Sequence, residues 1–268
     1  MNSATRLALN RINRRFYRDH AVDFSDKRSR PWPGWTRVLE SVVPNSSVQT
    51  SAGHAIRILD VGCGNGRFAQ FVASQISGSV SYVGVDSSEE LLRIAGARLT
   101  NLPGWRVELI EADVAAGVSI QGLEAEPFDL VAVFGVLHHI PGFESRASLL
   151  KALERTLGPS GRMALSYWQF ATLPRFQKRI VPWSRFNVSG EDSIDMDQLD
   201  SSDYLLAWGP IVPDMTDSII GLLRYCHHAS DRESEELVES LSLRVIDRFR
   251  SDGAGGGLNL YQILAKDR

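Results

Sequence analysis

The sequence predicts an α/β fold with a mostly parallel sheet, and two features of the chain support this prediction. First, short apolar runs alternate with segments of helical spacing between residues 56 and 168, as in parallel strands joined by crossover helices. Second, the first apolar run ends at the alternating glycines Gly62, Gly64 and Gly66, after which a helical segment begins. A strand, a glycine-rich turn and a helix N-terminus together form a cradle in which backbone N–H groups can approach a nucleotide-like ligand.

The composition is that of an ordinary globular protein. A length of 268 residues suits one domain with an elaborated insert, and a formal net charge of −3 gives no overall argument for nucleic acid or a membrane. The two cysteines, Cys63 and Cys226, form no CxxC pair, so we expect no disulfide framework, no zinc site and a reducing, cytoplasmic environment. The chain contains no run of about 18 apolar residues, so we expect no membrane-spanning helix.

Residues 1–54 are expected to form a helical, basic N-terminal arm followed by an aromatic turn. Apolar residues at mostly helical spacing predict a helix over residues 4–20, and its polar side carries five arginines. Such an arm is a candidate contact for phosphates or a carboxylate, and a solvated helix face is the alternative. After a rigid turn at residues 31–35, Thr36 could cap a short helix. Residues 44–54 are polar and mark a boundary.

Residues 55–268 are expected to hold the sheet. The predicted strands of its first part cover residues 56–61, 81–85, 106–111, 128–134 and 162–168. The predicted crossover helices cover residues 67–76, 89–99 and 146–157. The last of these helices is expected to stop at Gly158 and Pro159, because proline cannot continue a helix.

The alternation breaks between residues 169 and 230, where the chain is irregular and acidic. We interpret this segment as a partly helical insert after the fifth strand that forms a lid over the C-terminal edge of the sheet. A helix over residues 233–241 returns to the core. Residues 243–250 and 258–265 have the pattern of a final antiparallel pair of strands around a glycine-rich turn.

Three acidic residues follow successive predicted strands. Asp60 ends the first strand, Asp86 ends the second, and Asp113 follows the third. Because ligands of open α/β sheets bind at the carboxyl ends of the strands, we expect these carboxylates around one ligand. Asp60 could take a positive group, Asp86 could accept hydrogen bonds from a ribose diol, and Asp113 could accept one from an adenine amine. Helix capping is the alternative for Asp86, although Ser87 or Ser88 could supply the cap.

Six motifs together resemble those of the class I S-adenosylmethionine-dependent methyltransferases. They lie at residues 59–66, 84–86, 112–114, 127–131, 136–140 and 157–162. The resemblance implies a Rossmann-like, seven-stranded, mostly parallel sheet with an antiparallel last strand, and S-adenosylmethionine as the cofactor. The residues that we assign to cofactor binding are Asp60, Gly62, Cys63, Gly64, Asn65, Gly66, Asp86, Ser87, Ala112, Asp113, Val114, Phe134, Gly135, Arg28 and Trp32.

The flanking segments resemble a narrower family, the methyltransferases that esterify the carboxymethyl group of wobble uridine in tRNA. The matches lie at residues 24–33, 167–168, 203–208 and 224–227. This resemblance implies a tRNA anticodon loop as a partner, contacted by the basic arm, and it allows for an activating subunit. Ala207 and Cys226 depart from the family pattern, which usually has a proline and an aromatic residue at these positions.

The chemistry of methyl transfer narrows the expected catalytic groups. The reaction is an in-line displacement, so the protein mainly has to hold the acceptor atom and the methyl carbon in line. A carboxylate acceptor is already ionised at neutral pH and needs an orienting cation rather than a general base. We assign this role to Arg224 first and to Arg28 or Arg30 second, and an ion pair with an acid of the insert is the alternative for Arg224. The resemblance adds His227 as a neighbour of the acceptor.

His138 and His139 follow a buried strand. Adjacent histidines could indicate a metal, but we expect neighbouring side chains to point in divergent directions, and no further ligand is suitably spaced. We therefore predict no metal site and a place for His138 in the wall of the acceptor pocket. Trp32, Trp168 and Trp208 could stack on an acceptor base, and core packing is the alternative.

Two other functions remain open at this point. The acidic insert and the slightly acidic overall charge favour the same chemistry on a small molecule, as an O- or N-methyltransferase. A non-catalytic module that only binds the cofactor is the third hypothesis, and the presence of Asp60, Asp86 and Asp113 argues against it.

Overall fold

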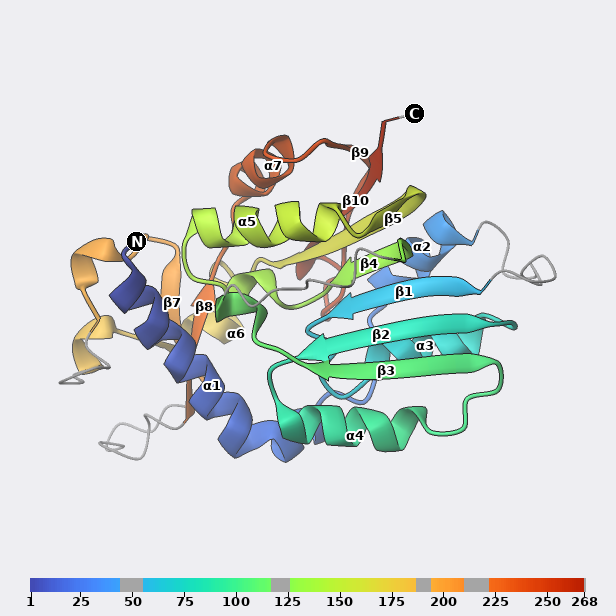
Figure 1. The fold of residues 1–268 in the computed structure, drawn as a ribbon. Coiled ribbons are helices and arrows are strands. Elements are labelled where there is room, and N and C mark those ends of the chain that lie inside the picture. Colours follow the sequence, from blue (N-terminus) through green and yellow to red (C-terminus); the bar gives the residue numbers. More distant parts are fainter. Residues whose placement is uncertain (44–54, 117–125, 187–193, 210–221, 268) are drawn as a thin grey trace.

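The structure, a computed structural model, describes residues 1–43, 55–116, 126–186, 194–209 and 222–267. Its main sheet has seven strands in the order β3-β2-β1-β4-β5-β10-β9 (Figure 1). These strands are β1 (Ile56–Val61), β2 (Val80–Asp86), β3 (Trp105–Glu111), β4 (Phe128–Val133), β5 (Leu157–Trp168), β9 (Leu243–Ser251) and β10 (Asn259–Lys266). The pairs among the first five strands are parallel, and β10 is antiparallel to both β5 and β9. The predicted α/β fold is thus confirmed.

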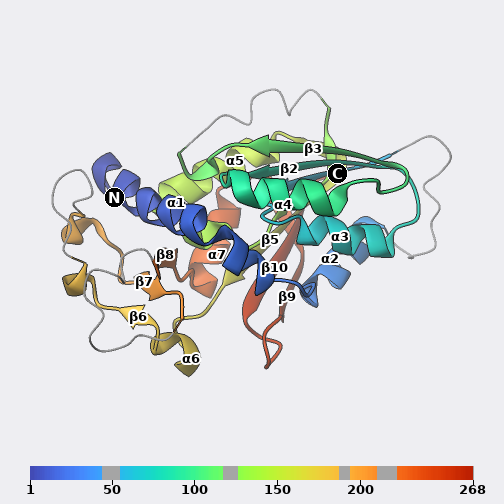
Figure 2. The same ribbon diagram turned by 90° about the horizontal axis from the view of Figure 1, so that it is seen from below.

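Helices cover both faces of this sheet (Figures 1 and 2). They are α2 (Gly34–Val42), α3 (Arg67–Gln75), α4 (Glu89–Leu99), α5 (Phe143–Glu154) and α7 (Asp231–Glu239). Buried side chains of α5 and α7 pack in one apolar cluster, and those of α2, α3 and α4 pack in a second. The middle strands β1 and β4 are therefore buried on both faces, which explains their nearly continuous apolar runs.

Two predicted helix boundaries are wrong. Helix α5 ends at Glu154, and Gly158 and Pro159 lie within β5 rather than after the helix. The chain enters the sheet early because Leu157 already pairs with Phe128 of β4. Helix α2 begins at Gly34 and has no side-chain cap, so Thr36 does not cap it.

The described part of the insert is partly helical, as we expected, but it also contains a small sheet that we did not predict. Its strands are β6 (Ile180–Val181), β7 (Asp203–Ala207) and β8 (Leu223–His227), paired antiparallel in the order β6-β7-β8. A short helix, α6 (Pro174–Gln177), precedes them. The acids Glu191 and Asp192, which we expected in this insert, lie outside the described residues.

The N-terminal helix packs against this small sheet. Helix α1 (Ser3–Asp26) is longer than predicted and has a kink at His20. Its Leu9 and Ile12 join Leu205 and Tyr225 in one apolar cluster, and both views place α1 beside β8 (Figures 1 and 2). We call α1, α6 and the strands β6 to β8 the cap. The boundary predicted at residues 44–54 lies outside the described residues.

No helix in the described part of the chain combines the length and the apolar character that a membrane crossing requires.

Candidate active site

A cavity of about 940 Å³ is lined by residues from the sheet and from the cap. A volume in this range is typical of ligand sites. The sheet contributes the segments that follow β1, β2 and β4, and the cap contributes α1, α6 and β8. The predicted cofactor residues that line the cavity are Arg28, Trp32, Asp60, Gly62, Cys63, Gly64, Asn65, Asp86, Ser87, Ala112, Asp113, Val114, Phe134 and Gly135.

The glycine-rich turn forms the floor of the cradle. Gly62 and Gly64 have positive φ angles of 70° and 53°, which side chains rarely allow. A Cβ atom on Gly62 would lie 2.2 Å from Cγ2 of Val136, whereas one on Gly64 would meet nothing within 4 Å. The space beside the Cα atom of Gly64 is therefore open to a ligand. Gly66 does not line the cavity as predicted; it begins α3, and a Cβ there would lie 3.1 Å from that of Ala95 on α4.

Asp60 and Asp86 are both held in place by neighbours. Asp60 is buried and accepts a hydrogen bond of 2.7 Å from the hydroxyl of Tyr82, and burial raises the pKa of its carboxyl to about 7. The carboxylate of Asp86 accepts hydrogen bonds from the backbone N–H groups of Gly64 (2.8 Å) and Ser88 (2.9 Å). Burial also raises the pKa of Asp86. Asp86 thus fixes the turn itself, and Ser88, not Asp86, caps α4.

Asp113 joins the cap to the sheet. Its carboxylate pairs with the guanidinium of Arg14 on α1 at 2.5 Å and accepts a hydrogen bond of 2.9 Å from the N–H of Ala115. Asn65 makes a second connection, because its side chain donates to Oγ of Ser25 at 3.0 Å. The three predicted carboxylates therefore line one cavity, while the ribose and adenine contacts remain predictions.

Arg224 lies at the other end of the cavity, on β8. Its side chain is 3% exposed, and the rings of Phe16 and Trp208 lie 5.0 and 4.9 Å from its guanidinium carbon. Its Nε is buried without a hydrogen-bond partner. Within the described residues, Arg224 has no acidic partner, so none of the described acids of the insert forms the ion pair that we considered as its alternative role.

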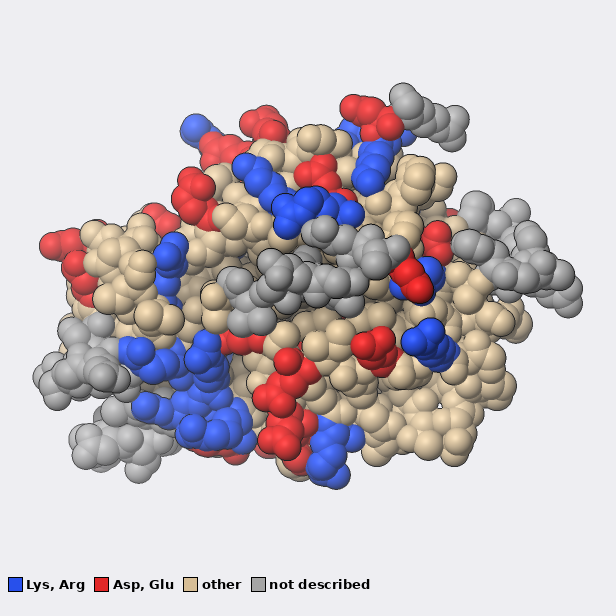
Figure 3. Space-filling view, in the orientation of Figure 1, with Lys and Arg blue, Asp and Glu red and all other residues tan. Residues whose placement is uncertain are grey.

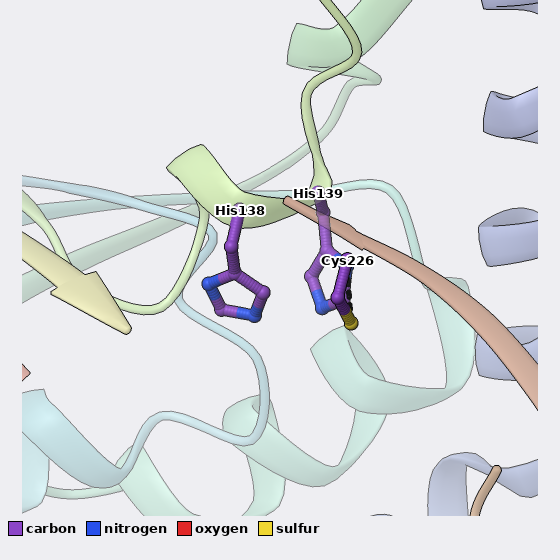
Figure 4. Close-up of side chains that lie close together, drawn as sticks. All are labelled: His138, His139 and Cys226. Carbon is purple, nitrogen blue, oxygen red and sulfur yellow. Dashed lines mark hydrogen bonds between the residues drawn. The ribbon is translucent and has the colours of Figure 1, made fainter. Parts of the chain in front are cut away.

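The two adjacent histidines lie side by side, contrary to our prediction of divergent directions (Figure 4). Their ring centroids are 4.1 Å apart. His138 lines the cavity as predicted and packs against the indole of Trp168. Burial lowers the pKa of His138, and His139 together with Arg224 lowers it further, so the ring is neutral. The residue thus forms part of the wall and is uncharged at neutral pH.

His139 is fixed by hydrogen bonds through both ring nitrogens. Its Nδ1 lies 2.9 Å from the carbonyl oxygen of Tyr225, and its Nε2 lies 2.8 Å from the hydroxyl of Tyr17. A carbonyl only accepts, so we assign the proton to Nδ1 and conclude that the Tyr17 hydroxyl donates to Nε2. The Tyr17 oxygen is then free to accept a hydrogen bond from Arg224. Burial lowers the pKa of His139 to about 3.

The ligand atoms of His138, His139 and Cys226 lie within 4.8 Å of one another (Figure 4), as in a metal site. Several observations argue against a metal there. Both nitrogens of His139 already have partners, and burial raises the pKa of the Cys226 thiol to about 12, so no thiolate is available. The nearby guanidinium of Arg224 also repels cations. We assign no metal to this group.

His227 does not line the cavity, so its predicted place beside the acceptor is wrong. Its ring nitrogens lie 2.7 Å from Asp203 and 2.7 Å from Glu233, which in turn pairs with the buried Arg146. This network joins the cap to α5 and α7. Asp203, one of the acids of the insert, is buried in this network.

Several lining residues escaped the sequence analysis. Tyr17, Arg14, Arg175 and Arg179 all line the cavity. In the sequence, Tyr17 is one of several apolar positions of a helix, and the arginines belong to ordinary polar faces. No local signal marks them, because only the packing of the cap on the sheet brings them to the cavity.

Comparison with known proteins identifies the core of the fold. Residues 58–161 match the family model described as a methyltransferase domain. This part of the chain is therefore a methyltransferase domain. The cradle built from Gly62, Gly64 and the three carboxylates fits the cofactor of this domain, which is S-adenosylmethionine.

Curated relatives resemble this methyltransferase domain at low identity. A demethylmenaquinone methyltransferase of Lactococcus lactis is 28% identical over 46% of this chain and 46% of that protein. A ubiquinone biosynthesis O-methyltransferase of Neisseria meningitidis is 28% identical over 50% of this chain and 59% of that protein. The chain thus matches about half the length of these relatives.

Solved structures share the fold across most of the chain. The magnesium protoporphyrin IX methyltransferase of Synechocystis has a TM-score of 0.61 and 12% identity, covering 96% of this chain and 99% of that one. A methyltransferase of Clostridium acetobutylicum has a TM-score of 0.59 and 13% identity, covering 93% and 98%. At these identities the likeness shows the methyltransferase fold, including the antiparallel strand β10.

Proposed function

We propose that this protein transfers the methyl group of S-adenosylmethionine to a carboxylate of a small molecule. The methyltransferase domain supports the reaction class. Relatives and structural neighbours that are named for ubiquinone, protoporphyrin and toxoflavin act on small molecules, which favours a small acceptor. The expected lid role of residues 169–230 belongs to this proposal, because α6 and β8 contribute walls of the cavity.

The single observation that carries the proposal is Arg224. A buried guanidinium with no acidic partner in the described part of the chain faces the same cavity as the cofactor cradle. A buried charge is costly unless it is paired, so the site is suited to an anion supplied by the substrate. A carboxylate matches the planar fork of arginine through two parallel hydrogen bonds.

The neighbouring groups favour an acceptor that is already ionised. Burial keeps the pKa of His139 near 3, and that of His138 is also depressed, so neither accepts a proton readily. Burial raises the pKa of Tyr17 to about 12, which leaves its hydroxyl neutral and committed to His139. A phenol or alcohol acceptor would need a base near the reacting atom. A carboxylate needs none.

Each half of the cavity then has a defined task. When bound, S-adenosylmethionine supplies a methyl group on a sulfonium centre. Asp60, Gly64 and Asp86 would hold this cofactor, while Arg224, positioned by Tyr17, would orient the acceptor carboxylate. The rings of Trp168 and Trp208 form an apolar wall that excludes water. The catalytic effect expected from these residues is positioning, which can account for several kcal/mol of the barrier.

Methyl-labelled S-adenosylmethionine tests the proposal. The protein is incubated with this donor and pools of small carboxylic acids, phenols and amines. We expect label only in the acid pool, in a form that mild alkali releases as methanol, because methyl esters hydrolyse there and methyl ethers do not. Alkali-stable label in the phenol or amine pool would contradict the carboxylate assignment.

A carboxymethylated wobble uridine of tRNA is a second candidate acceptor. One observation favours it: Lys and Arg residues gather on the surface over α1, next to the cavity (Figure 3). The activating subunit allowed by the sequence resemblance belongs to this candidate. Mass spectrometry of nucleosides from tRNA, before and after treatment with the protein and the donor, tests it. A new methyl ester on uridine would favour tRNA over a free small molecule.

A further inference from the structure

The cavity contains more positive than negative side chains. Among the described lining residues, eight are Lys or Arg and four are Asp. The basic ones are Arg14, Lys27, Arg28, Arg30, Arg67, Arg175, Arg179 and Arg224. A bound sulfonium would add a further positive charge, so the imbalance points to an anionic partner in the remaining space.

The four acids of the cavity balance only part of this charge. Asp113 pairs with Arg14, while Asp60 and Asp86 accept hydrogen bonds at the cofactor end. Asp252 is buried in the turn between β9 and β10, where it accepts hydrogen bonds from Asn259 (2.7 Å) and from the backbone N–H of Gly34 (3.0 Å). None of these carboxylates pairs with an arginine of α6 or β8 in the described part of the chain.

Three guanidiniums, those of Arg28, Arg179 and Arg224, line the same cavity. Burial lowers the pKa of Arg28, and the positive charges of Arg224 and Arg179 lower it further. Within the described residues, none of the three has an acidic partner. Like charges held together without a counterion are costly, so the arrangement favours a ligand that approaches all of them.

The arginines also differ in depth. Arg224 is buried, Arg28 and Arg179 are half-buried, and Arg175 on α6 is exposed. They therefore extend from the inside of the cavity to its surface. One carboxylate carries a single negative charge on its two oxygens, so it balances the charge of Arg224 alone. The outer arginines would then remain without a counterion.

Aromatic rings accompany this row of charges. The ring of Phe176 lies 4.7 Å from the guanidinium carbon of Arg175 and 5.0 Å from the ring of Trp168. The ring of Trp168 in turn lies 6.0 Å from the guanidinium carbon of Arg224. The space between the inner and outer arginines is thus lined by apolar rings, which suits a hydrocarbon or aromatic spacer.

We propose that the acceptor is a dianion whose second anionic group, a carboxylate or a phosphate, is held by Arg175 and Arg179, while Arg224 holds the carboxylate that is methylated. This inference rests on the proposed function and adds the substrate class to it. The inner group is the reacting one, and the outer group selects the substrate.

Small anions test the second subsite without knowledge of the natural acceptor. The protein is saturated with S-adenosylhomocysteine, and binding is followed by ligand-observed NMR at constant ionic strength. The probes are acetate, dicarboxylates with increasing spacing including an aromatic one, and phosphonocarboxylates of matching spacing. The variants are Arg224→Ala, the double variant Arg175→Ala with Arg179→Ala, and Arg232→Ala as a control. Arg232 is exposed and pairs with Glu236 away from the cavity.

We expect the best-spaced dianion to bind at least about tenfold more tightly than acetate, the effect of an additional charged hydrogen bond. The double variant should lose this advantage and keep acetate affinity within about twofold, and the control should change nothing. Stronger binding of phosphonocarboxylates than of dicarboxylates would identify the outer group as phosphate-like.

The two proposals fail in different ways. If no dianion binds more tightly than acetate, or if the double variant keeps the advantage, the second subsite is wrong. If Arg224→Ala leaves acetate binding unchanged, the carboxylate site of the proposed function is wrong instead.

Discussion

The two ends of the cavity differ in whether their charged side chains already have partners within the protein. At the cofactor end, every carboxylate already accepts hydrogen bonds from the protein, as Asp86 does from Gly64 and Ser88. At the acceptor end, Arg224 has no acidic partner in the described part of the chain, and its Nε has no hydrogen-bond partner. The first end is rigid before the ligand arrives, whereas the second has charge left over for a substrate. This contrast suggests that the cofactor site is general and that the acceptor site determines specificity.

The largest effect should follow from removing the charge at the acceptor end. We expect Arg224→Ala to lower carboxylate methylation about thirtyfold or more, because a charge-assisted pair in a buried site is worth about 2–5 kcal/mol when one partner is truncated. Steady-state turnover of an identified acid measures it, and Arg232→Ala is the exposed control. Unchanged turnover would discard the role of Arg224.

The glycines test the cofactor end with a matched pair. In Gly62→Ala, the new Cβ would lie 2.2 Å from Val136, so we expect a loss of about 2–3 kcal/mol in stability from strain and overpacking. In Gly64→Ala only the positive φ angle opposes the side chain, at a cost of about 1 kcal/mol. Urea unfolding without ligand compares the two. Gly64→Ala should instead weaken cofactor binding, because its methyl group enters the cradle. An equal loss of stability in Gly62→Ala and Gly64→Ala would contradict the difference that we expect between the two glycines.

A smaller effect is expected at Tyr17, which contacts Arg224 from α1. We expect Tyr17→Phe to raise the KM for a carboxylate acceptor about tenfold with little change in kcat, because a hydrogen bond to a charged group such as the Arg224 guanidinium is worth about 1.5 kcal/mol. The affinity of this variant for S-adenosylhomocysteine should stay unchanged. This is the control, because a variant that folds poorly would also lose cofactor affinity. An equal fall in cofactor affinity would show that Tyr17 acts on the whole cavity.

The smallest effect concerns the network behind the cap. Burial alone lowers the pKa of His227, but hydrogen bonds to Asp203 and Glu233 outweigh burial, and the net shift is upward. A group whose pKa is higher in the folded protein than in the unfolded chain stabilises the fold when it is protonated. This contribution is complete at pH values below the unfolded pKa of about 6.5, and it is lost as the pH rises through the folded pKa.

We therefore expect the stability of the parent protein to fall as the pH increases above about 6.5. His227→Asn should show a flatter dependence over the same range. Urea unfolding at several pH values measures both slopes, and identical slopes would remove His227 as the cause.

The sequence predicted the cofactor end well because its signals are local. Each strand of the parallel sheet is an apolar run in the chain, and Gly62, Asp86 and Asp113 follow such runs directly. The positions of β1 and α4 agree with the predicted ranges for the same reason.

The acceptor end was predicted less well because it depends on contacts between distant segments. Strand β6 has only two residues and pairs with β7 more than twenty positions later, which no periodicity reveals. His227 carried a motif match, yet Glu233 and Asp203 hold it away from the cavity. Conversely, Tyr17 reaches Arg224 only because α1 packs on β8.

One measurement tests the division of the cavity most directly: calorimetric titration of S-adenosylhomocysteine into Asp86→Ala and Arg224→Ala. The account predicts that Asp86→Ala weakens binding by about tenfold or more, since it removes a half-buried charged acceptor, while Arg224→Ala binds like the parent. Equal weakening in both variants, or unchanged binding in Asp86→Ala, would contradict it.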